Sequence, residues 1–223
     1  MTHSEQNYIK GIYHLSQGGT QPISTSALAG QMETKPSSVT DMVKRLGEKG
    51  LVDYRKYQGV QLTEAGIRQA LKVIRRHRLW EVFLLEKLDF SWDEVHEVAE
   101  QLEHIESDKL VDRLDALLDY PDFDPHGDPI PDKDGRFKTR SKVLLSKLPV
   151  GSRGICVGVK DSSSPFLKFL DKHHIELGIP IEVLDREPYD DSMQIRVGNR
   201  ELQVSHQIAA NLFIKPNSDS WNK

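Results

Sequence analysis

Two short helical patterns in the first fifty residues, separated by only a few polar residues, limit the folds that this chain can adopt. Ser24 suits the N-cap of the first helix, which we predict at 25–32. Pro36 suits the first turn of the second helix, and Gly50 suits the C′ position just beyond its end. Two short helices joined by such a tight connection predict a helix-turn-helix.

A strand pattern follows these helices directly. Residues 51–57 alternate between apolar and polar side chains, and the chain then turns at Gln58 and Gly59 into a second short strand. This β-hairpin corresponds to a wing. The sequence therefore predicts a winged helix-turn-helix DNA-binding domain, to which we assign residues 1–73.

The polar face of the second helix has the order of groups that a recognition helix needs. Small hydrogen-bonding side chains at its N-terminal end suit base edges, and cations further along suit phosphates. The predicted DNA contacts on this helix and on the wing are Pro36, Ser37, Ser38, Thr40, Asp41, Lys44, Arg55 and Lys56. The alternative is a helical domain that binds another protein, but residues 1–78 carry 12 Lys and Arg against 6 Asp and Glu, which favours DNA.

The charge balance reverses in the middle of the chain. Residues 79–140 carry 7 Lys and Arg against 18 Asp and Glu, although the whole chain has a net charge of only -4. Ordinary surface variation explains such an asymmetry unless the motifs of each segment agree with it. A basic head on an acidic body suits a polyanionic partner for the head and cations for the body.

The location of the protein is indicated by what its sequence lacks. No apolar run approaches the roughly 18 residues that cross a bilayer, and residues 1–11 show no charged-then-apolar leader pattern. The single cysteine, Cys156, excludes an intramolecular disulfide and a thiolate metal cage. We therefore expect a cytoplasmic protein with no membrane partner.

Histidine and glutamate recur at helical spacing in the acidic segment. Along two consecutive helical patterns they lie four, seven or eight positions apart, so each set shares one helix face. The two sets are His77 with Glu81, and His96, Glu100 and Glu103 with His104. A solvated charged face explains any one of them, but six at matched spacing favour a divalent transition metal, whose usual ligands include imidazole and carboxylate. We assign residues 74–140 to a helical metal-binding domain that also forms a homodimer, because its apolar stripes need a partner.

Two classes of metalloenzyme are disfavoured by the same spacing. Zinc peptidases need H-E-x-x-H, whereas residues 96–100 read HEVAE. Ferritin-like oxidases need paired E-x-x-H motifs, which these helices lack. We therefore expect no enzyme and no catalytic residue.

Five segments spread over nearly the whole chain form a specific combination of motifs. They are NYIKGIY, PSSVTDMVKRL, RRHRLWEVFL, HEVAEQLEHIESD and DPHGDPIP. Together they resemble the diphtheria toxin repressor family of metal-dependent repressors, in particular its manganese-responsive regulators. The family implies a homodimer that binds metal, closes and then grips a palindromic operator. It also implies a repressor of metal-uptake genes.

The resemblance implies ligands beyond those that the spacing indicates. The six His and Glu residues correspond to family ligands, and a second site corresponds to Glu81, Asp124, His126 and, from the C-terminal domain, Asp161. The chain has Glu100 where the iron-responsive branch has a cysteine. The implied metal is therefore Mn(II), with Fe(II) as the alternative and Zn(II) or Co(II) as ions that bind in vitro.

The chain departs from the family near its N-terminus. Asn7 stands where relatives have an Asp or Met ligand, but its side chain still offers a carbonyl oxygen. Lys10 stands where some manganese regulators have a Glu, and an ammonium group cannot bind a metal. These departures shift weight toward the second site.

The remaining residues, 141–223, form short alternating runs with short helices near 165–173 and 206–211. This pattern predicts a small SH3-like β-barrel, which the family also implies. The chain as a whole is expected to be mainly α.

Two rival functions are a sensor of a small organic ligand and a metal-storage protein. Acidic central helices disfavour an apolar pocket, so we expect no organic cofactor, and a storage protein has no need of a winged helix.

Overall fold

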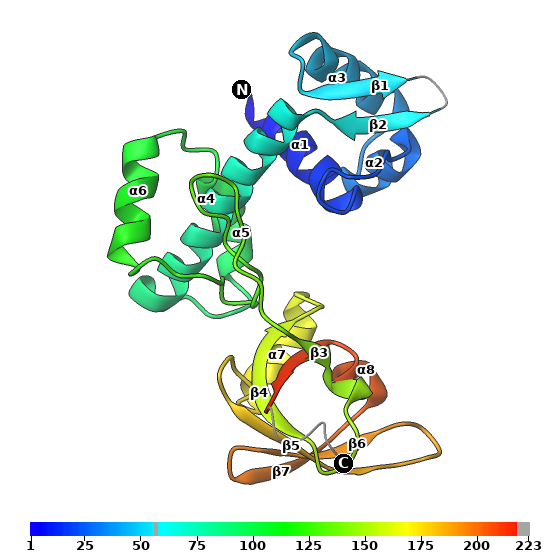
Figure 1. Cartoon of the computed structure of the whole chain (residues 1–223), viewed down its shortest axis with the longest axis vertical. Coiled ribbons are helices and arrows are strands. Elements are labelled where there is room, and N and C mark those ends of the chain that lie inside the picture. Colours follow the sequence, from blue (N-terminus) through cyan, green and yellow to red (C-terminus); the bar gives the residue numbers. More distant parts are fainter. Residues whose placement is uncertain (56–57, 218–223) are drawn as a thin grey trace. The chain divides into compact units, whose positions relative to one another are not determined.

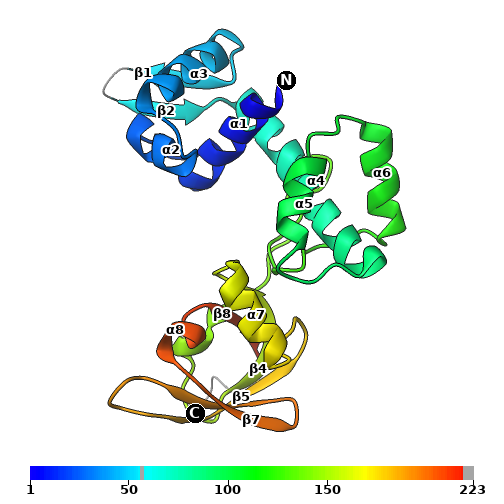
Figure 2. The same cartoon turned by 180° about the vertical axis from the view of Figure 1, so that it is seen from behind.

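The computed structural model describes residues 1–55 and 58–217 (Figures 1 and 2). The described chain divides into two compact units. The first comprises residues 1–78, 100–112 and 131–137, and the second comprises the rest. None of the helices in the described part is long and apolar enough to cross a membrane.

The first unit contains the predicted winged helix-turn-helix. Its elements are α1 (His3–Leu15), α2 (Thr25–Gln31), α3 (Pro36–Glu48), β1 (Val52–Arg55), β2 (Gly59–Leu62) and the first part of α4 (Glu64–Leu88). The capping signals hold: the Ser24 hydroxyl accepts from the Ala27 N–H, Pro36 opens α3, and Gly50 has a φ of +67° just past its end. Local sequence alone therefore sets these helix boundaries.

The wing is held against the helices by apolar burial. Strands β1 and β2 pair antiparallel, and both views show the hairpin beside α3 (Figures 1 and 2). The apolar side of α3 is buried at Val39, Val43 and Leu46 in one core with α1 and α2. Burying several such side chains contributes about 1.5–3 kcal/mol each, so packing rather than helix propensity fixes the polar face of α3 outward.

Three helices follow the wing, and each of them passes from one unit into the other. They are α4, α5 (Val95–Leu102) and α6 (Asp108–Leu117). The Thr63 hydroxyl accepts from the Gly66 N–H and so caps α4. These helices position the predicted metal ligands.

The C-terminal part of the second unit is a curled antiparallel sheet with the order β3-β8-β4-β5-β6-β7. Its elements are β3 (Val143–Leu144), the 3₁₀ turn Leu145–Lys147, β4 (Arg153–Val159), α7 (Ser164–Lys172), β5 (Pro180–Arg186), β6 (Met193–Val197), β7 (Arg200–Val204), α8 (His206–Ala209) and β8 (Leu212–Pro216). The prediction of a barrel is wrong in one respect, because the sheet is not closed: β3 is only two residues long and no ladder joins it to β7 in the described chain.

The connection between α4 and α5 is packed into the core of this sheet. The buried indole of Trp92 belongs to the same apolar cluster as α7 and the inner face of the strands. Beside it, Oδ2 of Asp93 accepts from the Ser164 hydroxyl at 2.9 Å and lies 3.2 Å from Nζ of Lys168. Within the second unit, apolar burial and a charged contact thus join this connection to α7.

The loop after α6 also lies directly on the sheet. The carbonyl oxygen of His126 accepts from the Val159 N–H at 2.9 Å. Gly127 has a φ of +83°, and a Cβ there would meet the Val157 oxygen at 2.1 Å. Only glycine fits this close approach of loop and strand.

Candidate metal centre and nucleic-acid interface

Most of the predicted DNA contacts that the structure describes lie on the outer side of the winged helix. Pro36, Ser37, Ser38, Asp41, Lys44 and Arg55 are exposed. Thr40 is half-buried and its hydroxyl donates to the Pro36 oxygen at 3.0 Å, so it is partly occupied within α3. Lys56 lies outside the described residues. The exposed set keeps small groups at the start of α3 and a cation further along, which is the order that DNA recognition needs.

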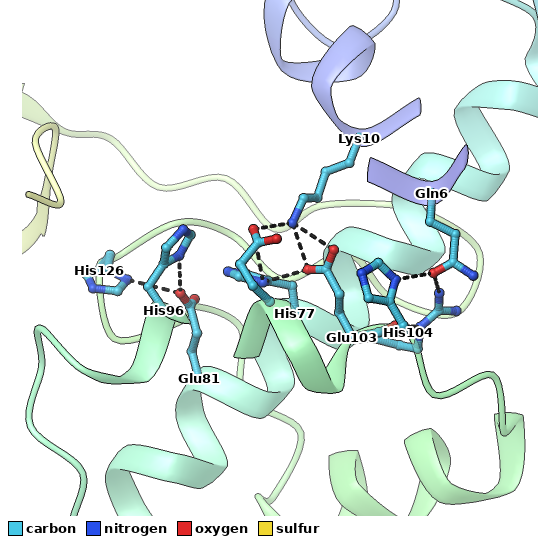
Figure 3. Close-up of polar contacts among 10 residues, drawn as sticks. Gln6, Lys10, His77, Glu81, His96, Glu103, His104 and His126 are labelled. Atoms are coloured by element: carbon cyan, nitrogen blue, oxygen red, sulfur yellow. Dashed lines mark hydrogen bonds and ion pairs between the residues drawn. The ribbon is translucent and has the colours of Figure 1, made fainter. Parts of the chain in front are cut away.

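A first group of predicted ligands, which we call the Lys10 cluster, comprises Lys10, His77, Glu100 and Glu103 in the first unit (Figure 3). Nζ of Lys10 lies 2.5 Å from Oε1 of Glu100 and 2.8 and 2.7 Å from the two oxygens of Glu103. Nδ1 of His77 lies 2.7 Å from Oε2 of Glu103. Side-chain exposure is 12% for Lys10, 34% for Glu100 and 0% for Glu103. The most buried carboxylate is therefore also the most fully paired.

The electrostatics of Glu103 follow from these contacts. Burial raises its pKa, but the hydrogen bond from His77 and the charge of Lys10 outweigh burial and leave the pKa below its ordinary value. Glu103 is therefore a carboxylate in the folded protein. Such a group is a ready ligand for any cation that reaches it.

Two further predicted ligands border the Lys10 cluster. Nδ1 of His104 contacts Oε1 of Gln6 at 2.7 Å, and the His104 ring stacks on His3 with centroids 4.3 Å apart. Burial lowers the pKa of His104, which favours the neutral imidazole that a metal requires. Asn7, three residues before Lys10 on α1, has a buried Oδ1 with no hydrogen-bond partner in the part of the chain that the structure describes. That oxygen fits the predicted carbonyl ligand.

A second group, which we call the His126 cluster, comprises Glu81, Asp124 and His126 in the second unit. Each offers one donor atom, and these atoms all lie within 4.8 Å of one another. All three residues are buried, with exposures of 2%, 4% and 6%. Asp124 is fixed by its own loop, because its Oδ1 accepts from the backbone N–H groups of His126 and Asp128 at 2.9 Å.

The surroundings of His126 show whether a metal ion fits the His126 cluster. Its Nε2 is buried without a hydrogen-bond partner in the described residues, which is costly for a polar atom. Its ring stacks on the indole of Trp92 with ring centroids 6.0 Å apart, and its Nδ1 lies 3.7 Å from Oε1 of Glu81. Two buried carboxylates and an imidazole nitrogen suit a divalent cation, so the residues of this cluster fit a metal.

The remaining predicted ligands lie at the edges of these clusters. His96 is 54% exposed, and its Nδ1 lies 3.1 Å from Oε1 of Glu81 (Figure 3). Oδ1 of Asp161 accepts from the Ser163 N–H at 2.8 Å, and Asp161 is not among the residues whose donor atoms converge in the His126 cluster. No sequence pattern signalled the roles of Gln6 and Trp92. For Lys10, the side chain type indicated only that it is not a ligand.

Models of known protein families match three consecutive parts of the chain. Residues 1–60 match the N-terminal DNA binding domain of iron dependent repressors, and residues 63–132 match their metal binding and dimerisation domain. Residues 143–216 match the FeoA domain. The three matches follow the order of the elements described above.

Individual proteins match over longer stretches. The diphtheria toxin repressor of Corynebacterium diphtheriae is 31% identical over 219 residues, which is 93% of this chain and 95% of that protein. The transcriptional regulator MntR of Oceanobacillus iheyensis is 34% identical over 64% of this chain and 90% of its own length. A solved structure of a manganese-dependent transcriptional repressor in complex with manganese is 33% identical and has a TM-score of 0.81, covering 96% of this chain and all of that chain.

Proposed function

The chain belongs to the diphtheria toxin repressor family and is a metal-dependent, DNA-binding transcriptional repressor rather than an enzyme, and we propose that Mn(II) is the metal to which it responds. The candidate ligands are oxygens and imidazole nitrogens, and Glu100 supplies a carboxylate at a position where the resemblance implies cysteine in iron-responsive relatives. Such a set favours Mn(II) relative to a site with a thiolate, and Fe(II) is the alternative.

The observation that carries this proposal is the His126 cluster, where three buried donor groups converge and Nε2 of His126 has no hydrogen-bond partner among the described residues. We place the first metal on Glu81, Asp124 and His126, with Asp161 as a fourth ligand from the C-terminal part. A bound divalent cation would neutralise the two carboxylates. A second metal is held by Glu100, Glu103 and His104 with the carbonyl oxygen of Asn7, and His77 and His96 support the two sites.

The second metal, at Glu100 and Glu103, links metal binding to DNA binding because one of its ligands belongs to the winged helix. Asn7 lies on α1, which shares the core of the winged helix, whereas Glu100 and Glu103 belong to the metal-binding region. A metal that joins them holds the winged helix in a fixed position. In a homodimer, two fixed heads match a palindromic operator that controls metal-uptake genes.

The test compares DNA affinity with and without metal. Duplexes selected from a random pool with Mn(II)-loaded protein are titrated with protein in Mn(II) or in chelator. We expect metal to tighten binding by about 5- to 150-fold, the usual range of coupling between two sites. Equal affinity in both conditions contradicts the proposal.

A matched control separates contact with DNA from metal sensing. Replacing the exposed Lys44 by Ala removes one phosphate contact, so it should weaken binding to all sequences and flatten the salt dependence by roughly one unit. The ratio of affinities with and without Mn(II) should stay the same in this variant.

A further inference from the structure

The ammonium group of Lys10 uses its full hydrogen-bonding capacity on carboxylates. An ammonium has three N–H donors, and the three nearest acceptors of Nζ are Oε1 of Glu100 and both oxygens of Glu103. All three distances lie in the range of charge-assisted hydrogen bonds or slightly below it. Lys10 is therefore held in place by the acidic groups, rather than extended into solvent beside them.

Those same oxygens are the ones that a divalent cation needs. Glu103 has no exposed side-chain surface, so it requires a positive partner at all times. A metal ion and the Lys10 ammonium group compete for the position between Glu100 and Glu103, because two positive charges in contact with the same three oxygens repel each other. Binding of one displaces the other.

We propose that Lys10 is a built-in competitor for metal. Its ammonium group occupies the cation position between Glu100 and Glu103, and a divalent metal binds there only by displacing it. This inference rests on the proposed metal-sensing function. It implies two metal-binding steps of unequal affinity, a tighter one at the His126 cluster and a weaker one at the Lys10 cluster.

Lys49 is a matched control for Lys10, because it neutralises a buried glutamate away from the candidate metal sites. Nζ of Lys49 lies 2.7 and 2.9 Å from the two oxygens of Glu5, which is also almost fully buried. Glu5 lies in the first turn of α1 and belongs to no candidate metal site. Lys10 and Lys49 therefore each neutralise a buried glutamate, but only Lys10 does so among predicted metal ligands.

The first experiment titrates the full chain with Mn(II) in a calorimeter. Lys10→Met keeps the apolar stem and removes the charge, so the weaker step should tighten by about ten-fold or more, equivalent to about 1.4 kcal/mol. The tighter step should not change. Lys49→Met should lower the melting temperature of the metal-free protein and leave both steps as in the wild type. An unchanged or weakened second step in Lys10→Met overturns the proposal.

The second experiment uses the wild-type protein and so does not depend on the folding of a variant. An amine-reactive reagent and mass spectrometry measure the accessibility of each lysine during the Mn(II) titration. Lys10 should be protected without metal and become reactive as the weaker step saturates, whereas Lys49 should not respond. If Lys10 stays protected at saturation, it is not displaced and the inference is wrong.

The outcomes distinguish this inference from the proposed function. A wild-type protein that takes up no Mn(II) and binds DNA equally with and without it contradicts the function. A wild-type protein with normal metal response, but with Lys10 protected and the Lys10→Met titration unchanged, contradicts only the role of Lys10.

Discussion

The Lys10 cluster and the His126 cluster draw on the same residue types but are arranged in opposite ways. In the first, a lysine ammonium group lies among the carboxylates and their oxygens are engaged. In the second, Nε2 of a buried histidine has no hydrogen-bond partner within the described residues. Similar ligand sets can therefore differ in what a metal must first displace. A metal at the Lys10 cluster must displace the ammonium group of Lys10. At the His126 cluster it meets Nε2 of His126, a ring nitrogen with no hydrogen-bond partner in the described residues.

Removing a ligand of the His126 cluster should have the largest effect. Loss of a group that merely supports a ligand typically costs 10- to 100-fold in metal affinity, so His126→Ala should weaken the tighter Mn(II) step by at least about 100-fold. Calorimetric titration measures it. His104→Ala is the counterpart in the other cluster and should weaken only the weaker step. The comparison is reversed if His126→Ala spares the tighter step and His104→Ala removes it.

The position of His126 depends on the backbone beside it, and Gly127 tests this dependence. An added Cβ would meet the Val157 oxygen at 2.1 Å and the Gly158 Cα at 2.4 Å, in a backbone with positive φ. Strain and overpacking together predict that Gly127→Ala lowers the free energy of unfolding by about 2–4 kcal/mol. The tighter Mn(II) step should weaken as well, because the adjacent His126 is displaced.

Gly151 is the matched control for this substitution. It has a φ of +84°, nearly the same as Gly127, but a Cβ there meets no atom of the described residues within 4 Å. Gly151→Ala should therefore cost only about 1–2 kcal/mol of backbone strain and leave both Mn(II) steps unchanged. Equal losses in the two variants, measured by denaturant unfolding, would mean that the contact of the loop with β4 does not support His126.

The smallest expected effect is a difference in pH dependence between the clusters. Burial lowers the pKa of His126, but the nearby carboxylates of Glu81 and Asp124 outweigh burial and leave the pKa raised. The pKa of His126 is higher in the folded protein than in the unfolded chain. The protonated ring therefore stabilises the metal-free protein at pH values below the pKa of the unfolded chain. This contribution is lost as the pH rises through the folded pKa.

Metal binding has the opposite sign, because a metal needs the neutral ring. Affinity at the tighter step should rise with pH, by at most about ten-fold per pH unit, and level off above the raised pKa of His126. The weaker step should level off at a lower pH, since burial lowers the pKa of His104. Titrations at a series of pH values measure both. Identical profiles for the two steps would contradict the assignment of one imidazole to each.

Much of the first unit follows from local sequence, and the fold shows why. Ser24, Pro36, Gly50 and Thr63 each act within one turn of the helix that they begin or end, so their effect needs no knowledge of distant contacts. Closure of the C-terminal sheet is a different kind of property. Alternation indicates strands, but it does not reveal that β3 is too short to complete a barrel.

The candidate site was predictable in its members but not in its pairing. Helical spacing placed His77 with Glu81 and His96 with Glu100, because positions four apart share a helix face. Insertion of Lys10 between Glu100 and Glu103 depends on how α1 packs near α5 and on the reach of a flexible side chain. Burial of Trp92 in the C-terminal core likewise depends on residues more than fifty positions away.

The stack of Trp92 on His126 gives the molecule an internal optical reporter. The emission of an indole depends on the charge and chemistry of the ring against which it lies, so a change at His126 alters the fluorescence of Trp92. The other tryptophans are Trp80, also in the second unit, and Trp221, outside the described residues, so the sequence of the first unit contains none. Light emitted by the unlabelled protein should therefore follow the occupancy of the His126 cluster far more closely than that of the Lys10 cluster.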